Sequence, residues 1–281
     1  MKTKIVFSEK CLGYGTWHIE GPQRVKLAHE VLMERGYEFL EPTPASEDDL
    51  LKVHDVDYLW NLKKGLVEDG DTPAYDKIYE FARLSAGGAL LAAKVGGFSL
   101  MRPPGHHAGV SGNALGAATR GFCYLNNIAI AVKSLGKPTL ILDIDGHHGN
   151  GTQEIFMGDP NVAYVSVHRH PLYPGTGFHS EGNSVNFALS GDVGEAQYLE
   201  TLDKALSMVD DVGRFGVVAV SAGFDTHAGD LASLGLTEKS YWQIGRRIAG
   251  LGKPTFFVLE GGYMGEKVGK DIDSLLKGFE G

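Results

Sequence analysis

The stretch TLILDIDGHHGNGT, residues 139–152, decides the fold and the chemistry expected of this chain. It begins as an apolar run and then turns abruptly into aspartates, histidines and glycines. Charges are almost never fully buried unless they are paired or bind a metal, so a buried strand with this ending indicates a site. Alternate side chains of an extended segment share a face, which lets Asp145 and His147 point at one ion. Asp143 lies farther from His147 and is better placed as a support.

The composition is that of an ordinary globular protein. The 281 residues are 43% hydrophobic and 22% charged, which is common for a single α/β domain, and we expect one domain over residues 1–281. The formal net charge of −9 argues against nucleic-acid binding, which needs a basic surface. Such a charge could attract a lysine peptide or a polyamine, although acidity that serves solubility is the more common explanation.

The cysteines and the N-terminal residues indicate in which cellular compartment we expect the protein. Cys11 and Cys123 form no Cys-x-x-Cys pattern, so neither a disulfide framework nor a thiolate zinc site is expected. The apolar run Ile5–Phe7 is too short for a signal peptide, and no stretch approaches the length of a membrane span. These features predict a cytoplasmic protein that has no membrane partner.

Short apolar segments alternate with helical ones along the chain. We expect strands at residues 4–7, 37–40, 98–101, 139–142, 162–167, 217–221 and 255–259. We expect helices at residues 22–35, 48–64 with a break near 53–55, 74–94, 128–135, 195–208 and 237–249. This alternation, with β-branched strands, predicts a parallel sheet covered by helices on both faces.

Polar clusters follow several of these strands at the point where each strand ends. They begin at Arg102, Asp143, Ser166, Ser221 and Glu260. In open α/β sheets, ligands bind outside the carboxyl ends of the strands. We therefore expect these clusters to converge on one site.

A catalytic metal needs at least one more protein ligand and an open position. The segment SAGFDTHAGD, residues 221–230, offers Asp225 nearest to its strand, with His227 and Asp230 as competing candidates. Two carboxylates and one imidazole suit Zn²⁺ or Fe²⁺, with water in the remaining place. The alternative is a salt-bridged strand end whose histidines face solvent.

A metal-bound water also needs a base for its proton and an acid for the leaving group. His106 and His107 follow a rigid Pro-Pro-Gly at another strand end; standing alone, they would be read equally well as surface histidines. Asp143 and Asn150 are free to orient the two imidazoles. Tyr263 either donates a hydrogen bond to a developing oxyanion or caps a helix. Together these groups predict hydrolysis of an amide or a related carbonyl.

Six motifs, taken in order, resemble the zinc-dependent histone deacetylase and acetylpolyamine amidohydrolase family. They are RPPGHHA, GFCYLNN, LDIDGHHGNGTQEIF, PGTG, SAGFDTHAGD and LEGGY. His18, Glu20, Pro22 and Arg24 also resemble the family's early H-x-E-x-P-x-R signature, with Ile19 where Pro is usual. The resemblance spans about residues 18–263. It implies a three-layer α/β fold of the arginase/deacetylase type, with a mainly parallel sheet of about eight strands.

At the matching positions the resemblance implies a role for each residue of the site. The implied zinc ligands are Asp145, His147 and Asp225. His106 and His107 become the general acid–base pair, and Tyr263 becomes the donor to the substrate carbonyl. Asp143 would orient the first histidine and, with Ser166 and backbone carbonyls, would hold a structural potassium ion.

The resemblance also implies how a substrate is bound. Phe122 and Tyr173 match the aromatic walls of an acyl-lysine tunnel, and the Gly121 carbonyl would accept the substrate N–H. Leu231 forms an apolar rim, which favours an acyl-lysine peptide or a small uncharged acyl amide. Asn150 resembles class II and prokaryotic members, since class I enzymes have Asp there.

The expected function is therefore removal of acetyl or other acyl groups from acylated lysine side chains or small amines by a metal-activated water. Acetylpolyamine deacetylation is the alternative within the same family. A ureohydrolase with two metal ions and a catalytically silent acyl-ligand binder are the other hypotheses. His148 is expected to be structural.

Overall fold

The parallel sheet is present in the computed structural model, which describes residues 2–281. Within these residues the sheet has eight strands in the order β2-β1-β3-β8-β7-β4-β5-β6, and each neighbouring pair is parallel. The predicted α/β class is thereby confirmed. The strands are β1 (Ile5–Val6), β2 (Phe39–Leu40), β3 (Phe98–Ser99), β4 (Thr139–Asp143), β5 (Val162–His170), β6 (Ser184–Ser190), β7 (Val217–Ala222) and β8 (Thr255–Leu259).

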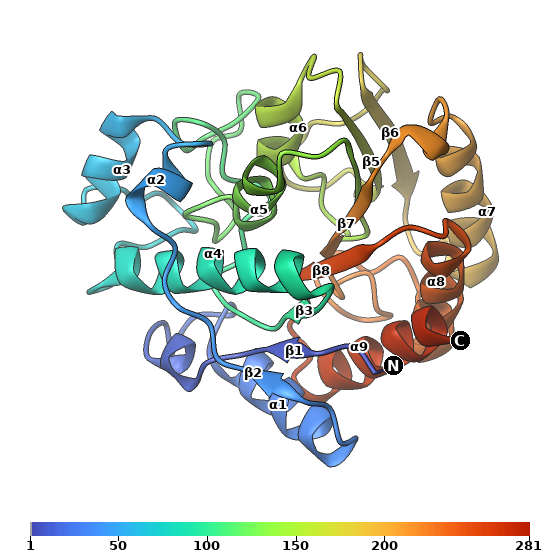
Figure 1. Ribbon diagram of the computed structural model, residues 1–281, viewed down its shortest axis with the longest axis horizontal. Helices are drawn as coiled ribbons and strands as arrows, with labels where there is room; N and C mark the ends of the chain where they lie inside the picture. Colours follow the sequence, from blue (N-terminus) through green and yellow to red (C-terminus); the bar gives the residue numbers. More distant parts are fainter. Residues whose placement is uncertain (1) are drawn as a thin grey trace.

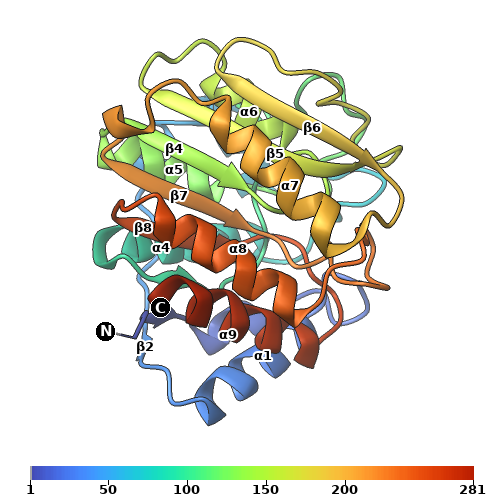
Figure 2. The ribbon, with the colours of Figure 1, turned by 90° about the vertical axis from the view of Figure 1, so that its right-hand side faces the viewer.

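Helices cover both faces of the sheet and give three layers (Figure 1). One face carries α4 (Ile78–Val95) and α5 (Asn127–Leu135), with α2 (Glu47–Leu50), α3 (Val56–Lys63) and α6 (Asn150–Phe156) farther along the same side. Figure 2 looks onto the other face, with α1 (Gln23–Glu34), α7 (Gly194–Ser207), α8 (Glu238–Gly250) and α9 (Glu266–Glu280). Short 3₁₀ helices lie at η1 (Glu9–Leu12) and η2 (Val212–Arg214).

Each face of the sheet has its own hydrophobic core. Successive side chains of a strand point to opposite faces, so Phe256 packs in the core under α4 and α5, and Phe257 packs in the core under α8 and α9. Leu140 and Ile141 divide in the same way on β4. Because both of their faces are covered, the central strands are mainly apolar, so the sequence alone predicts them.

The sequence prediction missed one strand and two helices. Strand β6 lies at the edge of the sheet and mixes buried, half-buried and exposed residues, so it lacks the continuous apolar run of the central strands. Helix α6 begins inside the polar segment at Asn150, and helix α9 contains Gly269 and Gly278. A Cβ at Gly278 would lie 2.1 Å from the backbone oxygen of Trp242. The glycines of α9 therefore permit close helix packing, although they lower its helix propensity.

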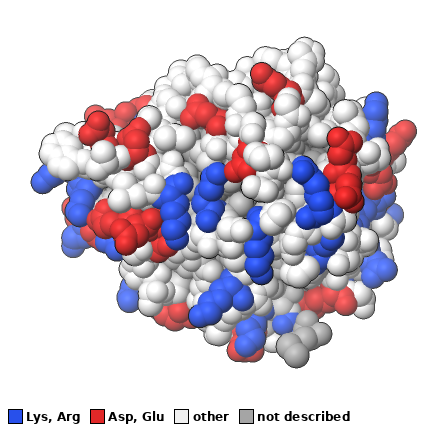
Figure 3. Space-filling model, turned by 45° about the horizontal axis from the view of Figure 1, so that its top comes forward, with Lys and Arg blue, Asp and Glu red and all other residues white. Residues whose placement is uncertain are grey.

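The surface is uneven in charge. Figure 3 shows Lys and Arg side chains gathered across the middle of one face, with Asp and Glu side chains toward its margins. The net charge of −9 is therefore not spread uniformly over the molecule. Among the described residues, the helices are all too short or too polar to cross a membrane.

Helix α8 offers a matched test of the packing between α8 and α9. A Cβ at Gly245 would lie 2.1 Å from the Leu275 carbonyl oxygen, whereas a Cβ at Gly250 of the same helix meets nothing within 4 Å. Gly245→Ala should destabilise the protein by about 1–3 kcal/mol because of overpacking. Gly250→Ala should leave stability unchanged or raise it by up to about 1 kcal/mol. Urea denaturation of both variants measures the difference, and equal stabilities would contradict this packing.

Candidate active site

Side chains from the carboxyl ends of four neighbouring strands meet at one edge of the sheet. The loop after β4 carries Asp145 and His147, and the loop after β7 carries Asp225. Among the described residues these three form a group whose ligand atoms all lie within 4.8 Å of one another. The loops after β3 and β8, which bring His106 and Tyr263, belong to the same edge because β3 pairs with β8 and β8 with β7.

Backbone N–H groups hold the two carboxylates of this triad in place. Oδ2 of Asp145 accepts a hydrogen bond from Gly261 N at 2.7 Å, and Oδ1 of Asp225 accepts one from Gly146 N at 2.8 Å. The opposite oxygens face Nδ1 of His147, at 3.3 Å for Asp145 and 2.8 Å for Asp225. A Cβ at Gly261 would lie 2.6 Å from the Asp145 carboxylate, so glycine is needed for this close approach.

The triad has the properties of a metal site. Asp145 and Asp225 are 1% and 0% exposed, so water solvates their negative charges hardly at all. Oδ2 of Asp225 lies 2.8 Å from Nδ1 of His147, but within the described residues it receives no well-aligned hydrogen bond. Burial and the nearby Asp145 carboxylate raise the pKa of Asp225 to about 6. A cation bound between these atoms would supply the missing partner, and the donors suit a divalent transition metal.

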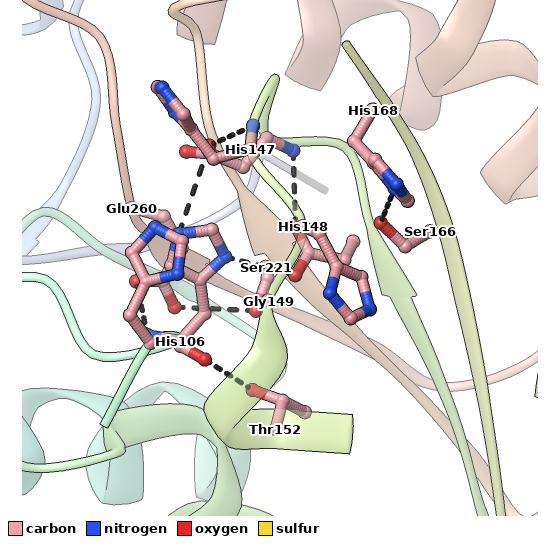
Figure 4. A network of polar contacts seen from close by, with 12 residues as sticks. His106, His147, His148, Gly149, Thr152, Ser166, His168, Ser221 and Glu260 are labelled. Carbon is pink, nitrogen blue, oxygen red and sulfur yellow. Dashed lines mark hydrogen bonds and ion pairs between the residues drawn. The ribbon is translucent and has the colours of Figure 1, made fainter. Parts of the chain in front are cut away.

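His106 and His107 form a pair of buried histidines. Figure 4 shows His106 near the triad residue His147. Nδ1 of His106 is 3.0 Å from Oδ2 of Asp143, and Nδ1 of His107 is 2.8 Å from Oδ1 of Asn150. The centroids of the two imidazole rings are 3.9 Å apart. Each ring therefore has a polar partner on its Nδ1, and these partners are the two residues that the sequence offered.

The two imidazoles differ in their preferred charge. Burial opposes the charged form of His106, but the carboxylates of Asp143 and Asp145 outweigh it and raise the pKa of His106 to about 10. Burial, together with the neighbouring His106 and His147, holds the pKa of His107 well below its usual range. One histidine of the pair thus favours holding a proton, and the other favours the neutral form that can accept one.

Tyr263 stands on a glycine-rich turn that is held at several backbone positions. Asp230 accepts a hydrogen bond from Tyr263 N at 2.8 Å. Arg24 donates from Nε to the Gly262 carbonyl at 2.6 Å and also hydrogen-bonds the carbonyl of Glu260. The Arg24 guanidinium lies 5.1 Å from the centroid of the Tyr263 ring. The phenol is thus carried by a fixed segment.

A cavity of about 160 Å³ leads to these groups. It is lined by Asp71, His107, Gly121, Phe122, His147, Tyr173, Leu231 and Tyr263. The rings of Phe122 and Tyr263 meet edge to face with centroids 5.9 Å apart, and Tyr173 meets His107 in the same way at 4.8 Å. Gly121 has φ of 51°, and a Cβ there would lie 2.5 Å from the His107 ring, so glycine leaves the cavity open.

The competing metal candidates lie outside the triad. His227 pairs through Nδ1 with Asp271 at 2.8 Å, and Asp230 binds the backbone of Tyr263. His148 faces away, toward Thr176 and Gln153.

Asp143 and Ser166, the residues expected to hold potassium, are register partners on β4 and β5. The Ser166 hydroxyl lies 2.9 Å from Nδ1 of His168. Asp143 also accepts hydrogen bonds from the Tyr164 hydroxyl at 2.9 Å and from Asp145 N at 3.1 Å.

Sequence reasoning gave no individual role to three polar groups of the site, although it named Glu260 at a strand end and Arg24 in a motif. Asp71 lines the cavity, Glu260 hydrogen-bonds the backbone before the histidine pair, and Arg24 holds the Tyr263 turn. Glu260 follows directly after a predicted strand, and this position indicated that its carboxylate lies at the site. Asp71 lies in a polar loop that carries no comparable signal.

The fold and this site define a deacetylase-type hydrolase. The sequence matches the histone deacetylase domain family over residues 18–279, and the chain belongs to that family. As a member it is a hydrolase that acts on amide bonds, as the sequence predicted.

Individual relatives agree with this placement. A probable deacetylase of Archaeoglobus fulgidus is 38% identical over 94% of this chain and 82% of its own length. The HDA15 HD domain has a TM-score of 0.89 at 30% identity, covering 99% of this chain and 88% of that one. The acetylpolyamine aminohydrolase of Burkholderia pseudomallei has a TM-score of 0.89 at 28% identity, covering 99% and 98%. These structures confirm the predicted fold type.

The triad geometry leads to a metal-binding prediction. Calorimetric titration with Zn²⁺ should give one ion per chain at this site. Asp225→Asn should weaken binding by more than about 100-fold, since partners outside the ligand set are already worth about 10- to 100-fold. Asp230→Asn is the control, because its carboxylate lies outside the triad. Equal losses in both variants would contradict the assignment of Asp225, and two bound ions would favour a ureohydrolase centre.

Proposed function

We propose that this protein is a zinc-dependent deacylase that removes acetyl or related acyl groups from acylated lysine side chains. The observation that carries the proposal is the lining of one cavity. It contains a histidine of the triad, one histidine of the buried pair, and a tyrosine. These are His147, His107 and Tyr263. A substrate carbonyl at the end of the cavity would meet all three.

Asp145, His147 and Asp225 would hold the zinc ion, and Fe²⁺ suits the same donors. When bound, the ion would act as a Lewis acid on the carbonyl and lower the pKa of a bound water. A structural potassium ion is proposed beside Asp143 and Ser166, whose carboxylate and hydroxyl offer the oxygen ligands that hard cations prefer.

His107 is the proposed general base. Its Nδ1 faces the amide oxygen of Asn150, because the amide nitrogen of Asn150 donates to the Ala114 carbonyl at 2.9 Å. An oxygen can only accept, so Nδ1 of His107 carries the proton and Nε2 is free to take one from water. His106, which holds its proton beside Asp143, is the partner that serves the leaving amine.

Tyr263 is the proposed donor to the substrate carbonyl oxygen. Burial keeps the pKa of Tyr263 well above its usual range, so the phenol stays protonated at neutral pH. A protonated hydroxyl that is already in position stabilises the charge that develops on the oxygen.

The walls of the cavity support an acyl-lysine side chain. Phe122 and Tyr173 would enclose the apolar methylenes, and Leu231 gives an apolar rim that is 43% exposed. Acyl groups on small amines fit the same chemistry.

Asp71 favours a second candidate, deacetylation of acetylpolyamines. Its carboxylate lines the cavity and would attract a cationic amine. The structural similarity to an acetylpolyamine aminohydrolase supports the same candidate.

Hydrolysis of an acetyl-lysine peptide tests the main proposal. His107→Ala should lower kcat by about 10²- to 10⁴-fold through loss of the general base. Tyr263→Phe should lower kcat by about 10²- to 10³-fold through loss of an oxyanion donor. The exposed His179 supplies a control, since His179→Ala should leave kcat unchanged. Activity that survives both metal chelation and His107→Ala would refute the mechanism, and zinc binding without turnover of any acyl amide would favour a silent binder.

A substrate panel separates the two candidate functions. We expect kcat/KM to be higher for acetyl-lysine peptides than for acetylputrescine, and Asp71→Asn to change this ratio little. If acetylputrescine is preferred and Asp71→Asn lowers its kcat/KM about tenfold or more, consistent with loss of one ion pair, the polyamine candidate replaces the peptide one.

A further inference from the structure

Glu260 is a buried carboxylate of the site to which the mechanism above gives no task. It is the first residue after β8 and is 0% exposed. Figure 4 shows it beside His106 and Ser221. A buried carboxylate is costly unless its oxygens are hydrogen-bonded, so its contacts indicate what it does.

Those contacts connect β8 to the loop that carries the histidine pair. Oε2 of Glu260 accepts hydrogen bonds from Gly105 N at 2.7 Å and from His106 N at 3.1 Å. Oε1 accepts one from the Ser221 hydroxyl at 3.3 Å. One oxygen therefore fixes two consecutive peptide groups, and these are the ones that lead into His106.

The opposite side of the same loop is packed against the start of α5. A Cβ at Gly105 would lie 2.5 Å from Asn127 N and from the Leu125 carbonyl oxygen. The loop is thus held between α5 and the Glu260 carboxylate. Without that carboxylate, two buried N–H groups would lose their acceptor, at a cost of about 1–3 kcal/mol each. We then expect the loop to shift so that these groups find other acceptors.

The segment that begins with Glu260 also contacts the rest of the site. Gly261 N donates to the triad residue Asp145, and Tyr263 follows two residues later. Arg24 hydrogen-bonds the carbonyls on either side of Gly261. A single short segment therefore relates the positions of the triad, the tyrosine and, through the Glu260 side chain, the histidines.

We propose that Glu260 is the positioning residue for the His106–His107 pair, acting as a hydrogen-bond acceptor for the backbone of Gly105 and His106. This inference rests on the proposed catalytic function of the pair. It requires an acceptor oxygen, which glutamine also has. The amide group of glutamine could then donate to Ser221 in place of accepting from it.

Steady-state kinetics of Glu260→Ala and Glu260→Gln test the proposal on the zinc-loaded protein. Small misplacement of catalytic groups costs up to about 100-fold in rate. We expect Glu260→Ala to lower kcat about 10- to 100-fold, with KM within about threefold and zinc content unchanged. Glu260→Gln should recover kcat to within about fivefold of the wild type, because the acceptor oxygen is restored.

Asp271→Asn is the matched control for general destabilisation. Asp271 is also a buried carboxylate, 1% exposed, but it pairs with His227 outside the catalytic groups. The Asp271→Asn variant should have a lower thermal stability than the wild type but the same kcat. The proposal is overturned if Glu260→Ala retains kcat within threefold of the wild type, if Glu260→Gln fails to recover it, or if Asp271→Asn loses kcat equally.

Histidine NMR separates failure of this inference from failure of the proposed function. If the wild type hydrolyses no acyl amide, the proposed function is wrong, and the ring resonances of His106 and His107 then decide the positioning role. Shifted or broadened resonances in Glu260→Ala, absent in Glu260→Gln and Asp271→Asn, would support it. Unchanged resonances in Glu260→Ala would overturn it.

Discussion

The structure depends on the burial of negative charge at one edge of the sheet. Asp143, Asp145 and Asp225 are almost fully removed from water, and an isolated buried carboxylate would take up a proton rather than stay charged. Two kinds of partner offset that cost. Imidazoles face each carboxylate, and backbone N–H groups such as Gly261 N bind the oxygens that the imidazoles leave free. The arrangement of loops around the site follows from supplying these partners.

The loops that carry the site are irregular in conformation but closely held. Glycines at positions such as Gly121 and Gly261 let backbone approach a ring or a carboxylate more closely than any side chain would allow. Buried side chains from distant segments then bind the loop backbone, as Arg24 does at the Tyr263 turn and Glu260 does before His106. Rigid placement of this kind is what a reaction that depends on preorganised donors and acceptors requires.

Local sequence predicted most of the sheet and the identity of the polar groups at its edge, but not their partners. Apolar runs such as residues 139–142 mark strands covered on both faces, whereas β6 at the edge has no such run. Because Asp145 and His147 are two positions apart in an extended segment, the sequence predicted that their side chains lie on the same face. The choice of Asp225 over Asp230 depends on the path of a loop, which spacing does not give. The contact of Glu260 with His106 joins residues 154 positions apart, beyond any periodicity argument.

The place of β8 in the strand order also affects when the sheet can fold during synthesis of the chain. This strand is the last of the sheet in sequence order, yet it lies between β3 and β7 in the middle of the sheet. On one side of it are strands from the first hundred residues, and on the other are strands from residue 139 onward. Until the ribosome releases residues 255–259, these two groups have no strand to join them. Such non-local pairing slows folding, so the sheet is completed only after residues 255–259 have been synthesised.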